Sequence, residues 1–272
     1  MKFEYYCPRW GYEHLAWDDF FRYVKEVGYH GVEYAIASST TEQELHEVWN
    51  LAERHGATMI PQHFDTYHAD FNQHYDHYAA WLEKLTGFSA PKIDSQTGKD
   101  FFTSEQNQSL IAVATEFTTA TGVAVLHETH RNKFSFAAHI TKSYLEALPD
   151  LRITLDVSHW VNVSESYLHD QPEALRLAIE RTDHIHARVG YPEGPQVPDP
   201  RAPEWSEALE THLAWWDRVI ERKRAVGKSV MTITPEFGAS PYTVLLPYTQ
   251  EPIASQREIN EYMMNLLKER YG

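Results

Sequence analysis

The sequence of 272 residues contains a single cysteine, Cys7. An intramolecular disulfide is therefore excluded, and cysteine usage gives no sign of an oxidising compartment. The chain also lacks any run that approaches the roughly 18 apolar residues of a membrane span, and the segment that starts at Met1 lacks the apolar centre of a secretion signal. We expect a cytoplasmic protein that does not contact a membrane.

Basic side chains are also scarce, relative to acidic ones. The sequence has 24 lysines and arginines against 39 aspartates and glutamates, and its formal net charge is −15. Nucleic-acid binding relies on lysine and arginine to displace counterions from phosphates, and a field of the opposite sign repels a phosphodiester backbone. We therefore expect no nucleic-acid partner, whereas a neutral sugar and a divalent cation are compatible with an acidic protein.

Short strand-like runs alternate along the whole chain with longer segments of helical periodicity. The expected strands are Phe3–Pro8, Gly31–Ala37, Thr58–Phe64, Lys92–Gln96, Val123–Glu128, Ile153–Asp156, His184–Arg188 and Met231–Glu236. The expected helices are Trp17–Val27, Glu42–His55, Asn72–Thr86, Glu105–Thr121, Phe136–Leu148, Pro172–Arg181, Glu207–Val226 and Gln256–Glu269. This alternation predicts a parallel sheet covered by helices.

The helix boundaries carry local signals. Thr41 and Glu44 have the spacing of a capping box, and Pro172 suits a first helical turn. Glycines such as Gly28 and Gly122 follow helical segments and leave only short connections to the next strand. By contrast, the connection Gly190–Trp205 after the seventh strand is long and rich in proline, and we interpret it as a rim loop.

Short loops at one end of the strands and long loops at the other are typical of a β/α barrel, whose active site lies at the carboxyl ends of the strands. A length of 272 residues is close to the roughly 250 typical of this fold. We predict an α/β fold in which residues 1–272 form one domain, a (β/α)8 TIM barrel. An open doubly wound sheet is the structural alternative.

Four consecutive expected strands end in side chains that can bind a metal, namely Glu128, Asp156, His186 and Glu236. Three carboxylates and one imidazole form a hard, oxygen-rich set that suits one Mn²⁺ or Mg²⁺ ion, with Zn²⁺ or Co²⁺ as alternatives. A cation would also offset the cost of burying three carboxylates together. His184 lies on the same side of its strand as His186 and is the alternative ligand.

Several stretches together resemble the xylose isomerase-like TIM barrels, which include the sugar phosphate isomerase/epimerase family. The resemblance rests on Gly28–Glu33, Glu128, the Asp156-Val-Ser-His159 segment, the His-x-His of strand seven and Pro235-Glu236. It implies that the four residues above bind one divalent metal. It also implies that Glu128 and Glu236 exchange the substrate proton, whereas Asp156 and His186 act only as ligands.

Further residues near the strand ends are candidates for substrate binding. The resemblance implies that His159 contacts a substrate oxygen, and a hydrogen bond to a metal ligand is the alternative. Arg188 could grip a substrate oxygen or pair with a carboxylate. His63 and Gln96 follow strands three and four, and we expect both to face the substrate. Trp160, together with Trp10 and Phe64, forms either an apolar wall against a sugar ring or rim packing.

These residues predict a metal-dependent isomerase or epimerase of a sugar or related polyhydroxy carbonyl compound. A base would remove the proton α to a carbonyl, and the metal would stabilise the resulting enediolate. The alternatives are a dehydratase or lyase on a keto-sugar or inosose, an AP endonuclease-like phosphodiesterase and a non-catalytic sugar-binding protein. No phosphate loop or basic cluster is visible near the strand ends, which favours a substrate without phosphate. A homo-oligomer is left open.

Overall fold

The structure is a computed structural model that describes residues 1–272, and its eight parallel strands close into a barrel in chain order. The strands are β1 (Lys2–Pro8), β2 (Gly31–Ala35), β3 (Thr58–His63), β4 (Ile93–Ser95), β5 (Val125–Glu128), β6 (Ile153–Leu155), β7 (Thr182–His186) and β8 (Val230–Thr234). Closure comes from β1 and β8, in which Lys2 pairs with Val230 and Tyr5 with Ile233. The predicted TIM barrel is therefore confirmed, and the open-sheet alternative is wrong.

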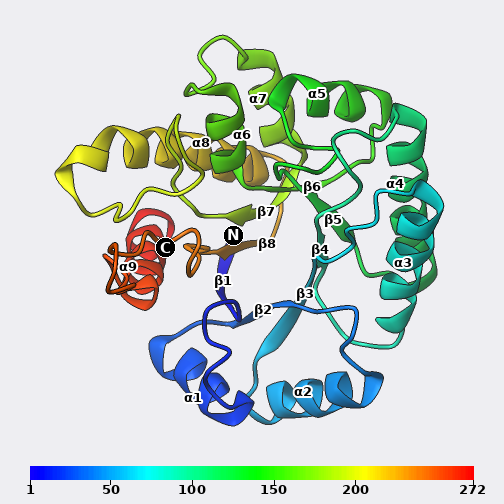
Figure 1. Ribbon diagram of the computed structural model, residues 1–272, viewed down its shortest axis with the longest axis horizontal. Coiled ribbons are helices and arrows are strands. Elements are labelled where there is room, and N and C mark those ends of the chain that lie inside the picture. Colours follow the sequence, from blue (N-terminus) through cyan, green and yellow to red (C-terminus); the bar gives the residue numbers. More distant parts are fainter.

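Helices surround the ring of strands on all sides (Figure 1). They are α1 (Trp17–Val27), α2 (Glu42–Arg54), α3 (Phe71–Lys84), α4 (Ser104–Thr121), α5 (Ala138–Ala147), α6 (Val157–Ser164), α7 (Pro172–Arg181), η1 (Pro203–Trp205), α8 (Ser206–Ala225) and α9 (Gln256–Tyr271). No helix combines the length and the apolar character that a bilayer crossing requires.

The local signals act as expected at several helix ends. Thr41 and Glu44 form a complete capping box at the start of α2. Gly28 and Gly122 end α1 and α4 in the left-handed region, with φ of 91° and 76°. Because a side chain at such angles would be strained, glycine allows the chain to leave each helix and turn at once into the next strand.

Helix α6 was not expected from the sequence. It begins directly after β6, where the side chain of Asp156 accepts a hydrogen bond from the backbone N–H of Ser158 and caps the helix. Its sequence is rich in β-branched and aromatic residues, which have low helix propensity. Burial of Val157, Trp160 and Val161 stabilises the helix instead, so tertiary packing overrides local preference.

The apolar core lies between the barrel and its helices, whereas the barrel interior is largely polar. Apolar side chains of the strands, such as Val32, Ile153 and Ile233, belong to one large buried cluster that also contains residues of the helices. Inside the barrel, Glu33 contacts His184, and Gln62 donates a hydrogen bond to Asp94. The strands therefore alternate between apolar side chains facing helices and polar side chains facing the barrel axis.

The carboxyl end of β8 is held by α9. Asn260, which is fully buried, accepts a hydrogen bond from the N–H of Phe237 (2.9 Å) and donates one to its carbonyl (3.0 Å). These two bonds fix the backbone immediately after Glu236. Helix α9 thereby positions one of the candidate ligands.

We expect Asn260→Ala to lower the free energy of unfolding by about 2 to 4 kcal/mol, because two buried backbone groups lose their partners. Urea unfolding followed by circular dichroism measures this change. Asn265→Ala, on the exposed side of the same helix, is the control and should change stability by less than about 0.5 kcal/mol. Equal stability of the two variants would show that the two hydrogen bonds of Asn260 contribute little to the stability of the fold.

Candidate active site

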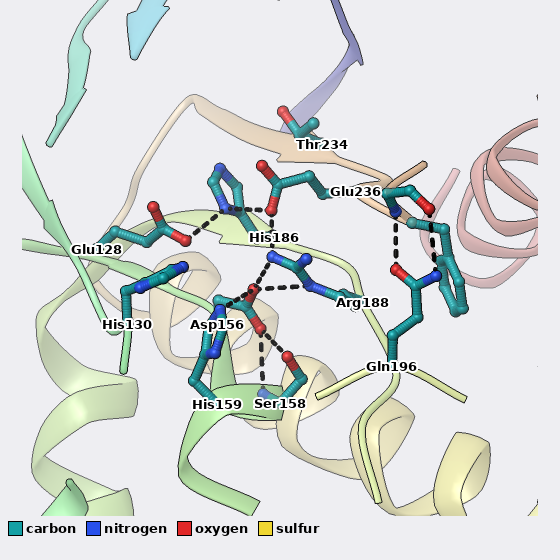
Figure 2. Close-up of polar contacts among 12 residues, drawn as sticks. Glu128, His130, Asp156, Ser158, His159, His186, Arg188, Gln196, Thr234 and Glu236 are labelled. Carbon is teal, nitrogen blue, oxygen red and sulfur yellow. Dashed lines mark hydrogen bonds and ion pairs between the residues drawn. The ribbon is translucent and has the colours of Figure 1, made fainter. Parts of the chain in front are cut away.

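The barrel brings the four candidate ligands to one point at the carboxyl ends of its strands. Glu128 ends β5, Asp156 follows β6, His186 ends β7 and Glu236 follows β8. One ligand atom from each lies within 4.8 Å of the others, and all four residues are buried. Figure 2 shows Glu128 and Glu236 reaching the imidazole of His186 from opposite sides.

Arg188 lies among these carboxylates. Its Nη2 donates to Asp156 Oδ2 (2.6 Å) and to Glu236 Oε2 (2.7 Å), and its Nε donates to Asp156 Oδ2 (3.0 Å). Asp156 Oδ1 accepts from the backbone N–H of Ser158 (3.1 Å) and from its hydroxyl (2.5 Å). Of the two roles that the sequence left open for Arg188, the structure shows the ion pair with carboxylates. Arg188 also lines the cavity above the site, where it could contact a substrate.

The unpaired atoms of the site fit a divalent cation. Both carboxylate oxygens of Glu128 are buried without a hydrogen-bond partner. His186 Nδ1 lies 3.4 Å from Glu128 and 2.9 Å from Glu236, yet it makes no hydrogen bond of acceptable geometry. Burial raises the pKa of Glu128 because a lone buried carboxylate is costly. Oxygen-rich donors of this kind suit a hard cation, so the four residues could hold a metal.

A second layer of side chains orients His186. Glu33 Oε1 lies 3.0 Å from His186 Nε2, and Glu33 Oε2 lies 3.2 Å from His184 Nε2. The hydroxyl of Thr234 also donates to Glu33. Because Nε2 of His186 is engaged by Glu33, its Nδ1 faces the carboxylates, whereas His184 points toward Thr232. The geometry therefore favours His186 over His184 as the ligand.

Charge governs the protonation of the surrounding groups. Burial alone would raise the pKa of Glu236, but His186 and Arg188 outweigh burial and lower it. Burial likewise opposes the ionised form of Glu33, whose pKa is nevertheless lowered by the two histidines. At Asp94, burial and the nearby Glu128 outweigh the opposing effect of His186 and raise the pKa well above its ordinary value. Negative charge is thus in excess at this end of the barrel.

A cavity of about 580 Å³ opens directly above the site. Its floor includes Gln62, Arg188 and Glu236, and its walls are largely aromatic, with Trp10, Tyr34, Phe64, Tyr67 and Tyr242 among the lining residues. A larger hollow of about 750 Å³ lies beside α1 and the segment before α9, but none of the candidate ligands lines it. The smaller cavity is therefore the one that belongs to the candidate active site, because a candidate ligand lines it.

The expected substrate contacts divide into two groups. Gln96 and Arg188 line the cavity. His159 is fully buried beside the site, with Nε2 3.6 Å from Asp156 Oδ2 and its ring 3.9 Å from that of His130. Its Nε2 has no hydrogen-bond partner. Burial lowers the pKa of His159 well below its ordinary value, which favours a neutral imidazole there.

His63 and Trp160 lie outside the cavity. His63 is fully buried between Tyr78 and Trp81 of α3, with ring centroids at 4.8 and 5.0 Å. Trp160 is also fully buried, and its Nε1 donates to the carbonyl of Ser135 (2.8 Å). His63 was expected to face the substrate, but Gln62 lines the cavity instead. Neighbouring residues of a strand face opposite sides, so only one of the two can do so.

Gln62, Tyr67, His130 and Tyr242 line the cavity but were not predicted from the sequence. For Gln62 a signal existed. Glu128 must face the barrel axis if it binds metal, so its neighbour His127 must face outward. The register of β3, β4 and β5 places His63 and Ser95 beside His127, so His63 also faces outward. Gln62, the residue before His63, must then face the axis. Tyr67 and Tyr242 lie in loops, where no periodicity indicates which way a side chain points.

No family model and no curated protein matches this sequence. Solved structures do resemble it. A probable 3-DHS dehydratase, AsbF, from Bacillus anthracis has a TM-score of 0.61 at 17% identity over 99% of this chain and 100% of that one. An AP endonuclease of family 2 from Brucella melitensis has a TM-score of 0.58 at 10% identity over 96% and 98% of the two chains. A D-tagatose 3-epimerase-like protein has a TM-score of 0.56 at 13% identity over the full length of both chains. At these identities the likenesses show a shared fold, which agrees with the predicted TIM barrel.

Added Mn²⁺ should raise the unfolding midpoint of chelator-treated protein, because an ion that binds only the native state stabilises it by about 2.7 kcal/mol at a hundredfold excess over its Kd. Thermal unfolding with and without Mn²⁺ measures the response. Glu128→Gln should lose most of it, although its metal-free stability should not fall, since Glu128 forms no hydrogen bond. The exposed Glu116→Gln is the control. A response of Glu128→Gln equal to that of wild type would place the metal elsewhere.

Glu33→Gln should weaken Mn²⁺ binding by roughly 10- to 100-fold, because His186 loses the carboxylate that orients its ring. Isothermal titration of chelator-treated protein measures the affinity. Glu33→Asp, which keeps the charge, should recover part of it. If all three proteins bind Mn²⁺ equally, Glu33 serves only to fill the barrel interior.

Proposed function

We propose that this protein is a divalent-metal-dependent isomerase or epimerase of a sugar or related polyhydroxy carbonyl compound. The observation that carries the proposal is that Glu128 and Glu236 reach His186 Nδ1 from opposite sides, at 3.4 and 2.9 Å, and that Glu236 also lines the aromatic-walled cavity. Two carboxylates so placed could take a proton from one side of a carbon atom and return it from the other.

Glu128, Asp156, His186 and Glu236 would hold the cation. When bound there, a divalent cation supplies Lewis-acid polarisation of the substrate carbonyl and stabilises the enediolate charge. Glu128 is suited to proton transfer because neither of its oxygens is engaged by another side chain through a hydrogen bond. Glu236 is held in place, since Oε1 accepts from Gln62 Nε2 (3.2 Å) and Oε2 from Arg188.

Arg188 has two roles in this scheme. It fixes Asp156 and Glu236 relative to each other, and its fixed positive charge lies where negative charge would develop on a substrate oxygen. Its Nη1 is buried without a partner and is available for such an oxygen. The aromatic walls, including Trp10, Phe64 and Tyr242, would exclude water from the reacting carbons and offer apolar faces to a sugar ring.

The structural neighbours are consistent with this chemistry. Two of them are described as an epimerase-like protein and a probable dehydratase. Both reaction types can begin with removal of a proton next to a carbonyl. The dehydratase or lyase reaction is therefore the alternative outcome of the same first step, in which a β-hydroxyl leaves from the enediolate.

The test follows deuterium incorporation into candidate ketoses and inososes in D₂O with Mn²⁺. Wild type should place solvent deuterium on a carbon next to the carbonyl, and Glu236→Gln or Glu128→Gln should slow this exchange by roughly 10²- to 10⁴-fold, as expected for loss of an acid/base group. The metal content of each variant is measured first, so that loss of metal is not mistaken for loss of proton transfer. Glu116→Gln is again the exposed control.

Mass spectrometry of the product separates the two reaction types. An isomerase or epimerase conserves the substrate mass apart from deuterium, whereas a dehydratase loses water and forms an unsaturated carbonyl. Full exchange activity in both glutamine variants would remove the proposed acid/base pair.

A further inference from the structure

Two lysine ammonium groups lie over one aromatic ring at the rim of the cavity. Lys99 Nζ is 5.5 Å and Lys133 Nζ is 5.9 Å from the ring centroid of Tyr67, which lines the cavity. These residues follow β4, β5 and β3, so they come from three consecutive loops at the carboxyl end of the barrel. The two charges therefore lie on the same face of the barrel as the candidate metal ligands.

The ammonium group of Lys133 lacks the partners that Lys92 and Lys223 have. It is 2% exposed, and its Nζ has neither a hydrogen-bond partner nor an ion pair. By contrast, Lys92 donates to the carbonyl of Asp183 and to the hydroxyl of Thr232, and Lys223 donates to the Asp183 carboxylate. A buried ammonium without a partner is costly, so its retention in an acidic protein points to a ligand.

The protein holds the two positive charges together against their repulsion. Burial and the neighbouring Lys99 lower the pKa of Lys133 to about 8. Asn107 grips both backbone groups of Lys99, accepting from its N–H (3.2 Å) and donating to its carbonyl (3.0 Å). Phe134 N–H donates to the carbonyl of Thr97, which ties the loop of Lys133 to the loop of Lys99.

Tyr67 covers this pair without being fixed itself. Its side chain is 64% exposed and its hydroxyl forms no hydrogen bond, whereas Lys99 and Lys133 are 5% and 2% exposed. Rotation of an exposed ring is fast and inexpensive. A small ligand could therefore reach the ammonium groups from the cavity once the ring moves.

We propose that Lys99 and Lys133 form an anion subsite beside Tyr67, which binds the acidic group of the substrate, a carboxylate or a phosphate. The inference rests on the proposed function for the position of the reacting carbons, and it narrows the substrate class to acidic polyhydroxy carbonyl compounds. It also departs from the sequence-based expectation of a substrate without phosphate, because Lys99 and Lys133 are 34 positions apart and the fold brings them together.

The test uses chelator-treated protein, so that anion binding to a metal cannot contribute. Inorganic phosphate and glycerate are titrated separately into wild type, Lys133→Met and Lys99→Met by calorimetry. Wild type should bind at least one of the two anions, and each variant should bind it roughly 10- to 100-fold more weakly, as expected for loss of a charge-assisted hydrogen bond. Lys142→Met, which removes a half-exposed lysine paired with Glu146, is the matched control and should bind like wild type.

A stability measurement guards against a folding defect. Removal of an unpaired buried ammonium should raise the unfolding midpoint of Lys133→Met above that of wild type below pH 8. Between about 8 and the ordinary value of 10.5, native wild type has released a proton that the unfolded chain retains, so wild-type stability rises with pH and the advantage of the variant should shrink. A lysine with a structural role would instead give a destabilised variant.

The outcomes separate the two proposals. Selective binding of phosphate or of glycerate identifies a phosphorylated or a carboxylated substrate. No binding of either anion to wild type, or equal binding by Lys133→Met, overturns the anion subsite. Because these titrations need neither metal nor turnover, a protein that binds anions but exchanges no substrate proton would overturn the proposed function and leave the subsite intact.

Discussion

The burial of several carboxylates inside the barrel is the constraint on which the rest of this structure depends. Glu33, Asp94, Glu128, Asp156 and Glu236 are all nearly or fully buried. A buried carboxylate is tolerated only where cations or hydrogen-bond donors compensate its charge. Arg188 and His186 supply much of that compensation, and Gln62 bridges Asp94 and Glu236. The interior of the barrel is therefore a network of polar contacts, and the apolar core that stabilises the fold lies outside it, between strands and helices.

Compensation is least complete at Glu128, which has no hydrogen-bond partner although its neighbours on the barrel axis do. This local deficit gives the site its chemical character. The arrangement below it is rigid, since Glu33 connects His184 and His186 and Asn260 clamps the backbone after Glu236. A cation would complete a charge balance that the side chains leave open, and the same deficit leaves Glu128 able to accept a proton. The unfavourable burial of Glu128 and its suitability for metal binding and proton transfer thus have the same physical origin.

The sequence predicts those features that depend on local periodicity or on position along a strand. The alternation of strands and helices predicts the barrel, because eight repeats of one unit leave few ways to close a sheet. Glu128, Asp156, His186 and Glu236 are brought together because each lies at the exit of a strand, although their role as ligands stays a prediction. His63 shows where this kind of prediction fails. Its strand was expected correctly, but successive side chains of a strand face opposite sides, so an error of one residue reverses the expected direction. Helix α6 and the cavity wall at Tyr242 depend on tertiary packing and loop conformation, which periodicity does not encode.

The charges of the cavity are arranged with opposite signs at its two ends. Glu236 gives the floor its negative charge, with Glu128 close to it in the candidate ligand set, and Lys99 and Lys133 give the Tyr67 side of the rim its positive charge. A chain of net charge −15 repels anions over most of its surface, so an acidic substrate would need a local reversal of sign to enter. The same reversal would orient it, since the acidic group is attracted to the rim and repelled by the floor. A polyhydroxy compound with a carbonyl at one end and an acid at the other would then bind in a single direction, with its carbonyl toward the carboxylates.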